Sequence, residues 1–367
     1  MVKKILILTA GFGEGHNSAA RGLREGLRRV APPETQVELH DLFAETYGAV
    51  NDWARVLYLG MIVQAPQIWR SIYRWLDRQE KFAGDFRVFF ALKNQLKGML
   101  DRLQPDVIVS VYPAYSHMLD ELLGPEGAPQ HKRVVVVTDS ISVNAIWYRC
   151  SADYFILPNE QSAAVLLEAG VPSEKIKTLG FPVNPTFVNP GEIRPSPSDQ
   201  AGRRVLYIIN AANDAAPDLV RRLAGLHDIQ LTVTMGRNAG LKISVEKIRR
   251  TVTQEFETVE WSDDLPRLLR GNHIVISKAG GATVQEAMAA GCPMIINHII
   301  PGQEEGNARF IVESNSGIIA LTHDAVIAAI QNAFANNAVR WHEWEKNIRL
   351  LGRPSASLDI ARFLLSI

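Results

Sequence analysis

The sequence predicts an α/β protein made of two doubly wound, Rossmann-like domains that face each other across a cleft. With 367 residues, the chain is longer than one ordinary hydrophobic core supports, so two domains are expected. Apolar runs rich in Val, Ile and Leu alternate with helical patterns, which is typical of parallel sheets covered by helices on both faces. A proline-rich stretch divides these runs into two groups, as a stiff linker between domains would.

The first group of apolar runs defines an N-terminal domain over residues 1–185. Its expected strands are KILIL, VELHDL, DVIVSV, RVVVVTD and YFILP, at residues 4–8, 37–42, 106–111, 133–139 and 154–158. The helical pattern NSAARGLREGLRRV at residues 17–30 follows the first run, so this part of the chain is expected to repeat strand–helix–strand units.

The second group defines a C-terminal domain over residues 204–340, after a linker at residues 186–203. Its expected strands are RVLYIIN, IQLTVTM, ETVEW, HIVIS and PMIIN, at residues 204–210, 229–235, 257–261, 273–277 and 293–297. Residues 341–367 are expected to form C-terminal helices that pack back toward the N-terminal domain.

The composition restricts the partners and the compartment. The formal net charge is zero, so bulk charge indicates no nucleic-acid partner. Cys150 and Cys292 form no metal or redox motif and are interpreted as buried thiols in a reducing compartment. The apolar run near the N-terminus is too short for a secretory signal, and no stretch reaches the roughly 20 apolar residues of a spanning helix. We therefore expect a cytoplasmic protein whose membrane contact, if any, is peripheral.

An insertion at residues 43–102 is longer than a crossover helix requires. Between Trp53 and Arg102 it holds nine Lys or Arg residues against four Asp or Glu, and nine aromatic residues. Basic and aromatic residues at helical spacing are typical of a helix that lies in a membrane interface. The alternative is an internal helical pair whose aromatic residues form core. The residues expected at a membrane or lipid acceptor are Trp53, Trp69, Arg70, Tyr73, Arg74 and Trp75.

The stretch ILILTAGFGEGHNSAARGL, residues 5–23, places three glycines and a histidine between a strand and a helix. Gly11, Gly13 and Gly15 do not have the spacing of the dinucleotide-binding fingerprint, nor is this a Gly-Lys-Ser phosphate loop. His16 lies where the positive end of a helix dipole opposes protonation, so a neutral imidazole could take a proton from a hydroxyl. Alternatively, the glycines form a tight turn and His16 caps the helix.

A second glycine loop, KAGGAT, follows the strand that ends at Ser277. Gly280 and Gly281 let backbone amides approach an anion, and the Thr283 hydroxyl can add a hydrogen bond. Glu286 is expected in the first helical turn, where a carboxylate can accept bonds from both hydroxyls of a ribose.

The next strand leads into HIIPGQEEGNA, a loop rich in groups that hydrogen-bond a sugar. The residues of this kind are Gln303, Glu304 and Asn307. Together, the two loops indicate a nucleotide-sugar site. The alternative is an ordinary α/β loop with polar residues on its surface.

These motifs resemble those of a known enzyme family. GFGEGHNSAARGL, VVVVTDSISVNAIWY, ADYFILPNEQSAAVLLEAGVPSEKIKTLGFPVNPTF and ISKAGGATVQEAMAAGCPMIINHIIPGQEEGNA are similar to segments of the monogalactosyldiacylglycerol synthases and processive diacylglycerol glucosyltransferases. These are inverting glycosyltransferases of the GT-B fold. The resemblance covers most of residues 4–320, and the last motif is the most specific. The related peptidoglycan N-acetylglucosaminyltransferases fit the PGQEEGN segment less well.

The resemblance implies a donor site for a UDP-sugar, UDP-glucose or UDP-galactose, in the C-terminal domain. The glycines of KAGGAT and Thr283 would meet the diphosphate, Glu286 the ribose, and Gln303 and Glu304 the sugar. VEWSDDLPRLL resembles the family's uracil-side loop, which places backbone near Glu260 and Trp261 at the base.

For the acceptor side, the resemblance implies that His16 is the general base or helps to hold the diphosphate. Asp139, which leaves its strand into the same cleft, is the second candidate base; the alternative is an aspartate that caps the following turn. The insertion falls where the family docks on membranes, so a lipid acceptor and an anionic membrane surface are expected partners.

One segment departs from the family. After the first strand of the C-terminal domain the family carries a second glycine-rich loop, whereas residues 207–220 read YIINAANDAAPDLV, without glycine. A ligand contact there is therefore in doubt, and a different donor or lipid remains open.

The expected reaction is direct displacement at the anomeric carbon. No Asp-x-Asp pair occurs in the chain, so helix N-termini and backbone amides are expected to stabilise the leaving UDP without an obligatory metal or other cofactor. Two alternatives stay open: a UDP-sugar epimerase or hydrolase of the same fold, and a non-catalytic nucleotide-sugar-binding protein.

Overall fold

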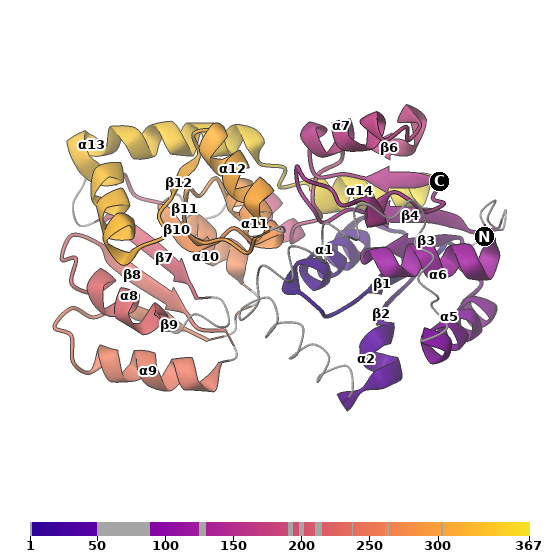
Figure 1. The fold of residues 1–367 in the computed structure, drawn as a ribbon, viewed down its shortest axis with the longest axis horizontal. Coiled ribbons are helices and arrows are strands. Elements are labelled where there is room, and N and C mark those ends of the chain that lie inside the picture. Colours follow the sequence, from indigo (N-terminus) through magenta and orange to yellow (C-terminus); the bar gives the residue numbers. More distant parts are fainter. Residues whose placement is uncertain are drawn as a thin grey trace. The chain divides into compact units, whose positions relative to one another are not determined.

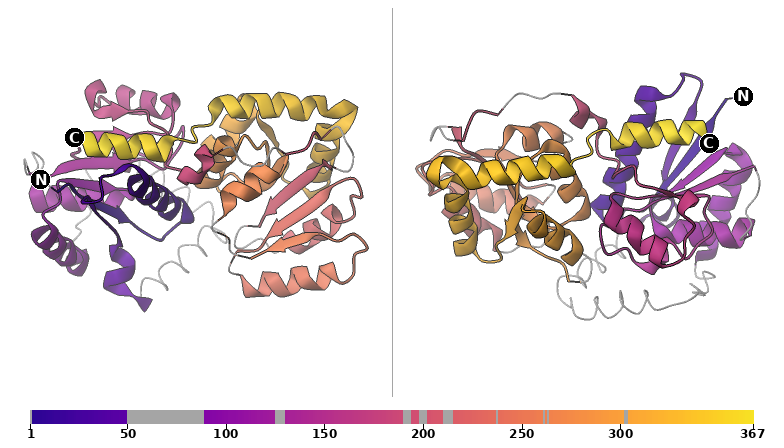
Figure 2. Two further views of the ribbon diagram at one scale, coloured as in Figure 1. Left: turned by 180° about the vertical axis from the view of Figure 1, so that it is seen from behind. Right: turned by 90° about the horizontal axis from the view of Figure 1, so that it is seen from above.

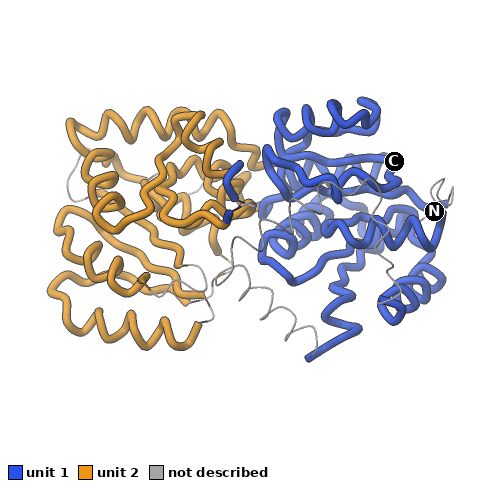
Figure 3. The backbone as a smooth tube through the Cα atoms, in the orientation of Figure 1, with its two compact units in different colours: residues 1–185, 301–306, 355–367 blue, residues 186–300, 307–354 orange. Residues whose placement is uncertain are grey.

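The computed structural model describes residues 2–49, 89–124, 130–189, 194–197, 202–209, 215–236, 238–260, 262, 264–301 and 304–367. These residues form two compact units (Figure 3). Unit 1 comprises residues 1–185, 301–306 and 355–367, and unit 2 comprises residues 186–300 and 307–354.

Unit 1 is built on a six-stranded parallel sheet (Figure 1). Its strands, in the spatial order β2-β1-β3-β4-β5-β6, are β1 Lys4–Thr9, β2 Gln36–Asp41, β3 Val107–Ser110, β4 Lys132–Val136, β5 Tyr154–Ile156 and β6 Ile176–Lys177. The order reverses at β1, which lies between β2 and β3. In doubly wound sheets, ligands bind at such a reversal, beyond the carboxyl ends of the strands.

The helices of unit 1 cover this sheet. They are α1 Glu14–Val30, α2 Leu42–Tyr47, α5 Phe90–Leu103, α6 Pro113–Leu123, α7 Glu160–Glu168 and α14 Ala356–Ser366, with 3-10 turns at Ala145–Trp147 (η2) and Ser173–Lys175 (η3). Figure 2 shows α14, in yellow, alongside the indigo α1. A Cβ atom on Gly26 would lie 2.5 Å from the carbonyl oxygen of Ser357, so only glycine permits this close packing.

Unit 2 repeats the architecture with a second six-stranded parallel sheet. In the spatial order β12-β11-β10-β7-β8-β9, its strands are β7 Arg204–Ile208, β8 Gln230–Thr234, β9 Glu257–Val259, β10 Ile274–Lys278, β11 Met294–His298 and β12 Gly317–Ile319. The order reverses between β7 and β10, which are neighbours in the sheet.

Unit 2 has six described helices, and three of them begin at a residue that caps the helix with its side chain. They are α8 Ala216–Leu223, α9 Ala239–Arg249, α10 Leu265–Gly271, α11 Gly281–Ala290, α12 Glu305–Glu313 and α13 His323–Leu351. Asp264, Asn238 and Thr322 cap the starts of α10, α9 and α13 with their side chains. Non-helical residues at 335–338 divide α13 into two helical pieces.

The two predicted doubly wound sheets are confirmed, and each of the ten expected strands has a counterpart. Each sheet also has an edge strand that the sequence pattern did not predict, β6 and β12. β6 has two residues and lies in the polar stretch EKIKT, so no apolar pattern marks it, whereas β12 lies in the apolar run GIIAL, which the predicted strands do not include. Among the described helices, none is both long enough and apolar enough to cross a membrane.

Candidate active site

The start of α1 brings His16 to the carboxyl edge of the sheet in unit 1. His16 is the third residue of the helix, after the N-cap Gly13. Its Nδ1 lies 3.0 Å from the carbonyl oxygen of Val111, which follows β3, and 3.0 Å from Oγ1 of Thr138, which follows β4. One helix start and the ends of two neighbouring strands therefore meet at this imidazole.

These partners determine the protonation state of His16. A carbonyl oxygen can only accept, so Nδ1 carries the ring hydrogen and Nε2 carries the lone pair. Burial lowers the pKa of His16 to about 4, and the hydrogen bond to Val111 opposes this shift. The neutral imidazole that a general base requires is therefore present at pH 7, with burial as its main cause. A helix-capping role does not fit, because Nδ1 faces Val111 and Thr138.

Asp139 and Trp147 lie beside this histidine. The Trp147 indole donates a hydrogen bond from Nε1 to Oδ2 of Asp139 at 2.9 Å. This bond fixes the orientation of the carboxylate, although Trp147 lies eight residues further along the chain. The ring centroids of Trp147 and His16 are 5.9 Å apart, and Tyr112 meets His16 edge-on at 5.1 Å. The two residues that the sequence singled out for catalysis thus contact the same indole ring.

The glycine loop before His16 is open on one side. Among the described residues, no heavy atom outside the immediate chain neighbours lies within 4 Å of the position that a Cβ atom would take on Gly13 or Gly15, and neither glycine has a positive φ. At Gly11, the backbone N–H donates to Oδ2 of Asp41 at 2.8 Å. Neither steric crowding nor a positive φ therefore requires glycine at positions 13 and 15. Without side chains, these residues leave their backbone accessible to a ligand.

In unit 2, the KAGGAT loop joins β10 to α11. Gly280 is the N-cap of α11, and Gly281 and Thr283 are its first and third residues, so the backbone N–H groups of its first turn are aligned along the helix axis. The expectation that Glu286 lies in the first turn is wrong, because the helix begins at Gly281 and Glu286 is its sixth residue. The Glu286 side chain is buried, with 8% exposure.

Asn307 connects this loop to α12. Its Nδ2 donates to the carbonyl oxygen of Ala279 at 3.0 Å, and the N–H of Ala279 donates to the carbonyl oxygen of His298 at 3.1 Å. The Asn307 side chain is 4% exposed, and its Oδ1 is buried without a hydrogen-bond partner among the described residues. Asn307 therefore fixes the glycine loop through its amide nitrogen. Glu304 is also buried.

Several predicted residues lie outside the part of the chain that the structure describes. They are the insertion residues Trp53, Trp69, Arg70, Tyr73, Arg74 and Trp75, the donor-site residues Trp261 and Gln303, and the glycine-free stretch at residues 210–214. Their roles stay predictions.

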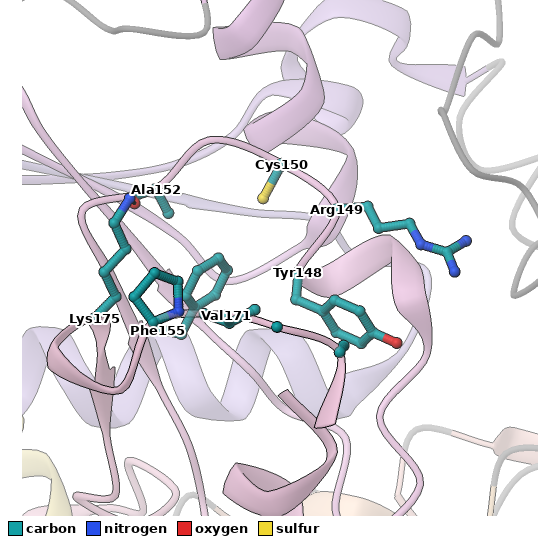
Figure 4. A pocket seen from close by; sticks show the side chains of 10 residues that line it. Tyr148, Arg149, Cys150, Ala152, Phe155, Val171 and Lys175 are labelled. Carbon is teal, nitrogen blue, oxygen red and sulfur yellow. The ribbon is translucent and has the colours of Figure 1, made fainter. Parts of the chain in front are cut away.

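A pocket of about 390 Å³ opens at the other edge of the unit 1 sheet, next to the amino ends of β5 and β6 (Figure 4). Its lining residues are Tyr148, Arg149, Cys150, Ala152, Phe155, Ala169, Gly170, Val171, Pro172 and Lys175. Burial raises the pKa of the Cys150 thiol to about 12, so this group is protonated and unreactive. His16, Asp139 and Trp147 are not among the residues that line this pocket.

The chain matches known proteins along nearly its whole length. Residues 16–183 match the family model of monogalactosyldiacylglycerol (MGDG) synthase, and residues 204–347 match that of the glycosyltransferase family 28 C-terminal domain. The processive diacylglycerol beta-glucosyltransferase of Bacillus subtilis (strain 168) is 26% identical over 374 residues, which cover 99% of this chain and 95% of that protein. The chain therefore combines a segment similar to MGDG synthase with a glycosyltransferase family 28 C-terminal domain, and it is a glycosyltransferase.

Other relatives of this glycosyltransferase agree. The processive diacylglycerol beta-glucosyltransferase of Bacillus licheniformis is 26% identical, with 97% of this chain and 92% of that protein covered. Among solved structures, MurG of Acinetobacter baumannii has a TM-score of 0.61 at 15% identity, over 100% of both chains. MnaA of S. aureus with UDP has a TM-score of 0.62 at 15% identity, over 100% of this chain and 97% of that one. These structures confirm the GT-B fold, and the two family models together with the named relatives support a UDP-sugar-dependent glycosyltransferase.

The sequence patterns missed three groups that contact His16 or the glycine loop before it. The carbonyl oxygen of Val111 leaves no signal, because any residue supplies one. Asp41 is the last residue of β2. Asp139 was identified as an aspartate at the end of an apolar run, and the same rule could have found Asp41. Tyr112 is the second residue after β3 and could have been found in the same way.

Proposed function

We propose that this glycosyltransferase moves a hexose from UDP-glucose or UDP-galactose to a lipid hydroxyl, such as that of diacylglycerol, at the surface of an anionic membrane. The observation that carries the proposal is the neutral His16, whose Nδ1 is engaged by Val111 while Nε2 holds the lone pair. The names of the relatives from both Bacillus species support the acceptor class.

In the proposed reaction, Nε2 of His16 takes the proton of the acceptor hydroxyl. The acceptor oxygen forms a bond to the anomeric carbon as the bond from that carbon to the UDP oxygen breaks, and UDP leaves with the electron pair. Because one bond forms on the face opposite the bond that breaks, the configuration at this carbon inverts. Asp139, which accepts a hydrogen bond from Trp147, is assigned either to stabilise the imidazolium that forms or to act as the second candidate base.

The leaving diphosphate is assigned to the start of α11. Backbone N–H groups at Gly280, Gly281 and Thr283 supply partial positive charge there without a proton transfer. Asn307 keeps the loop in place through Ala279. This arrangement, with the lack of an Asp-x-Asp pair, supports turnover that requires no metal ion. Glu286 is assigned to the ribose, and Gln303 and Glu304 to the sugar.

The experiment that tests this function uses the full chain, vesicles of anionic phospholipid with diacylglycerol, and a panel of UDP-sugars. UDP release and glycolipid product are measured together, with EDTA present and with added Mg²⁺. We expect one UDP-hexose to give both products at the same rate in either condition. A rate that collapses with EDTA would contradict the metal-independent reaction.

The two measurements separate the proposed function from its alternatives. UDP release without glycolipid would indicate a hydrolase or another acceptor, and a UDP-sugar converted to its epimer would indicate an epimerase. Calorimetric binding of UDP without release from any donor would indicate a silent binding protein. Vesicles without diacylglycerol are the matched control, because they keep the surface and remove the acceptor hydroxyl.

A further inference from the structure

Ile141, two residues beyond Asp139, has a backbone conformation that branched side chains avoid. Its φ is 68°, in the left-handed region. The other described non-glycine residues with positive φ are Gln104, Asn315, Asn336, Asn337 and Ala338, so Ile141 is the one β-branched residue of this described set. A β-branched residue at positive φ crowds its own backbone, and such strain persists only where the surroundings impose it.

The strain belongs to a three-residue turn. The N–H of Ser142 donates to the carbonyl oxygen of Ser140 at 2.8 Å, a hydrogen bond that spans only Ile141. With a positive φ at the central residue, this is a γ-turn of the rare, strained type. The turn reverses the chain just after Asp139 leaves β4 and directs it toward the 3-10 turn η2, which ends at Trp147.

The start of α7 holds this turn in place. The backbone N–H of Ile141 donates to Oγ of Ser162 at 2.9 Å, and Nδ2 of Asn159 donates to Oγ of Ser140 at 3.0 Å. Asn159 is the N-cap of α7, and its Oδ1 accepts from both the N–H and the hydroxyl of the fully buried Ser162. Two side chains of one helix cap therefore impose the conformation that Ile141 would not adopt by itself.

The turn closes a loop around the candidate base. Before it, Thr138 contacts Nδ1 of His16; after it, Trp147 returns to donate to Asp139 and lies beside the His16 ring. A change of direction at Ile141 would move Asp139 and Trp147 relative to each other. We propose that Ile141 is a positioning residue, whose strained turn, clamped by Asn159 and Ser162, sets Asp139 and Trp147 against His16. For its effect on catalysis, this inference rests on the proposed function.

The test is the substitution Ile141→Gly, which removes the side chain that causes the strain. Strain relief should raise Tm by roughly 2–4 °C. A freer loop should lower kcat about tenfold at an unchanged KM for the donor, since a misplaced base costs rate and leaves donor binding intact. Few substitutions raise stability and lower kcat together, and a purely structural role for Ile141 predicts no loss of kcat.

The matched control is Gln104→Gly, at a positive-φ residue in the same unit, just after α5. It should leave kcat unchanged whatever its effect on Tm, because Gly relieves the positive φ but also removes the hydrogen bonds that Nε2 of Gln104 donates to the carbonyl oxygens of Leu100 and Asp101. A second variant, Ser162→Ala, removes the clamp and keeps the strain, so it should lower both Tm and kcat. A Tm that falls in Ile141→Gly, or a kcat that falls equally in Gln104→Gly, would overturn the inference.

A second readout does not depend on turnover. NMR titration of labelled histidines, with His16→Gln to assign the signal, should give a pKa near 4 for His16 in the wild type. In Ile141→Gly this pKa should rise toward the ordinary value as the loop around the ring loosens. An unchanged pKa would overturn the inference. If the wild type makes no glycolipid, the proposed function fails, and the titration still decides the role of the turn.

Discussion

The indole nitrogen of Trp147 lies 2.9 Å from Oδ2 of Asp139, which joins a buried aromatic ring to a carboxylate across a nine-residue segment. We expect Trp147→Phe to lower kcat roughly ten- to hundredfold, because a hydrogen bond to a charged group contributes about 1.5–3 kcal/mol. The KM for the donor should not change. Steady-state kinetics on vesicles measure both constants.

A double substitution shows whether Trp147 acts through Asp139. If it does, Trp147→Phe should cost little more in an Asp139→Asn background than Asp139→Asn costs alone. Additive losses would mean that Trp147 affects the rate by another route, such as its contact with His16.

The pH dependence of the reaction should report the low pKa of His16. A general base acts only when it is unprotonated, and burial lowers the pKa of His16 to about 4. As the pH falls from 7, kcat/KM should stay level to about pH 5 and then decline as Nε2 is protonated. His16→Gln should lower kcat about 10²- to 10⁴-fold and remove this limb, with UDP affinity retained. A limb centred near pH 6.5 would exclude His16, in this buried state, as the base.

Asn307→Asp should weaken donor binding although the two side chains have the same shape. The carboxylate cannot donate to the carbonyl oxygen of Ala279, and it places negative charge beside the loop assigned to the diphosphate. We expect the KM for the UDP-sugar and the Kd for UDP to rise about tenfold, as measured by kinetics and calorimetry. Equal affinities would show that the Asn307 bond to Ala279 is not what holds the loop.

Two glycine-to-alanine substitutions in unit 1 should change stability in opposite directions. At Gly26 in α1, a Cβ atom would lie 2.5 Å from the carbonyl oxygen of Ser357, so overpacking should cost about 1–3 kcal/mol. At Gly98 in α5, no heavy atom of the part of the chain that the structure describes lies within 4 Å of the added carbon, so helix propensity should contribute about 1 kcal/mol of stabilisation. Calorimetric melting of both variants is the measurement. A stable Gly26→Ala would mean that α14 can move away from α1 at little cost.

His273 should make unit 2 sensitive to acid. The side chain is fully buried; Nδ1 accepts from the N–H of Arg204 at 3.0 Å, and Nε2 donates to the carbonyl oxygen of Pro195 at 2.8 Å. Burial lowers its pKa to about 4. Between pH 6.5 and 4 the unfolded chain binds a proton that the folded chain does not. The free energy of unfolding therefore falls as the pH drops through this window, by on the order of 3 kcal/mol for this group.

The matched variant for this prediction is His273→Gln. It should melt at a lower temperature than the wild type at pH 7, because Gln cannot reproduce both hydrogen bonds, but it should lose less stability between pH 7 and pH 4.5. Parallel losses in the two proteins would assign the acid sensitivity to other groups.

Much of the fold could be predicted from local patterns. Runs rich in Val, Ile and Leu, such as β1 and β10, can be predicted as strands from the sequence, because strands buried on both faces contain few polar residues. The edge strands β2 and β9 were also predictable from their sequences, whereas the two residues of β6 lie in a polar stretch and depend on their pairing with β5.

The candidate site was predictable where it depends on side-chain type and unpredictable where it depends on backbone. His16 and Asp139 stand out because each follows or ends an apolar strand, and the structure brings both to Trp147. The carbonyl oxygen of Val111 and the positive φ of Ile141 arise from the path of the chain after folding. The sequence pattern predicts Glu286 one turn too early in α11, because a pair of glycines does not mark which residue begins the helix.

The packing of α14 on α1 also bears on the order in which the protein takes shape as it is synthesised. The face of α1 around Gly26 is completed by Ser357, which is synthesised only after all of unit 2. Unit 2 is almost continuous in the chain and can close while synthesis proceeds. The nascent unit 1 must meanwhile leave uncovered the face of α1 on which α14 packs, so chaperone binding to stalled chains should stop once residues 356–366 emerge.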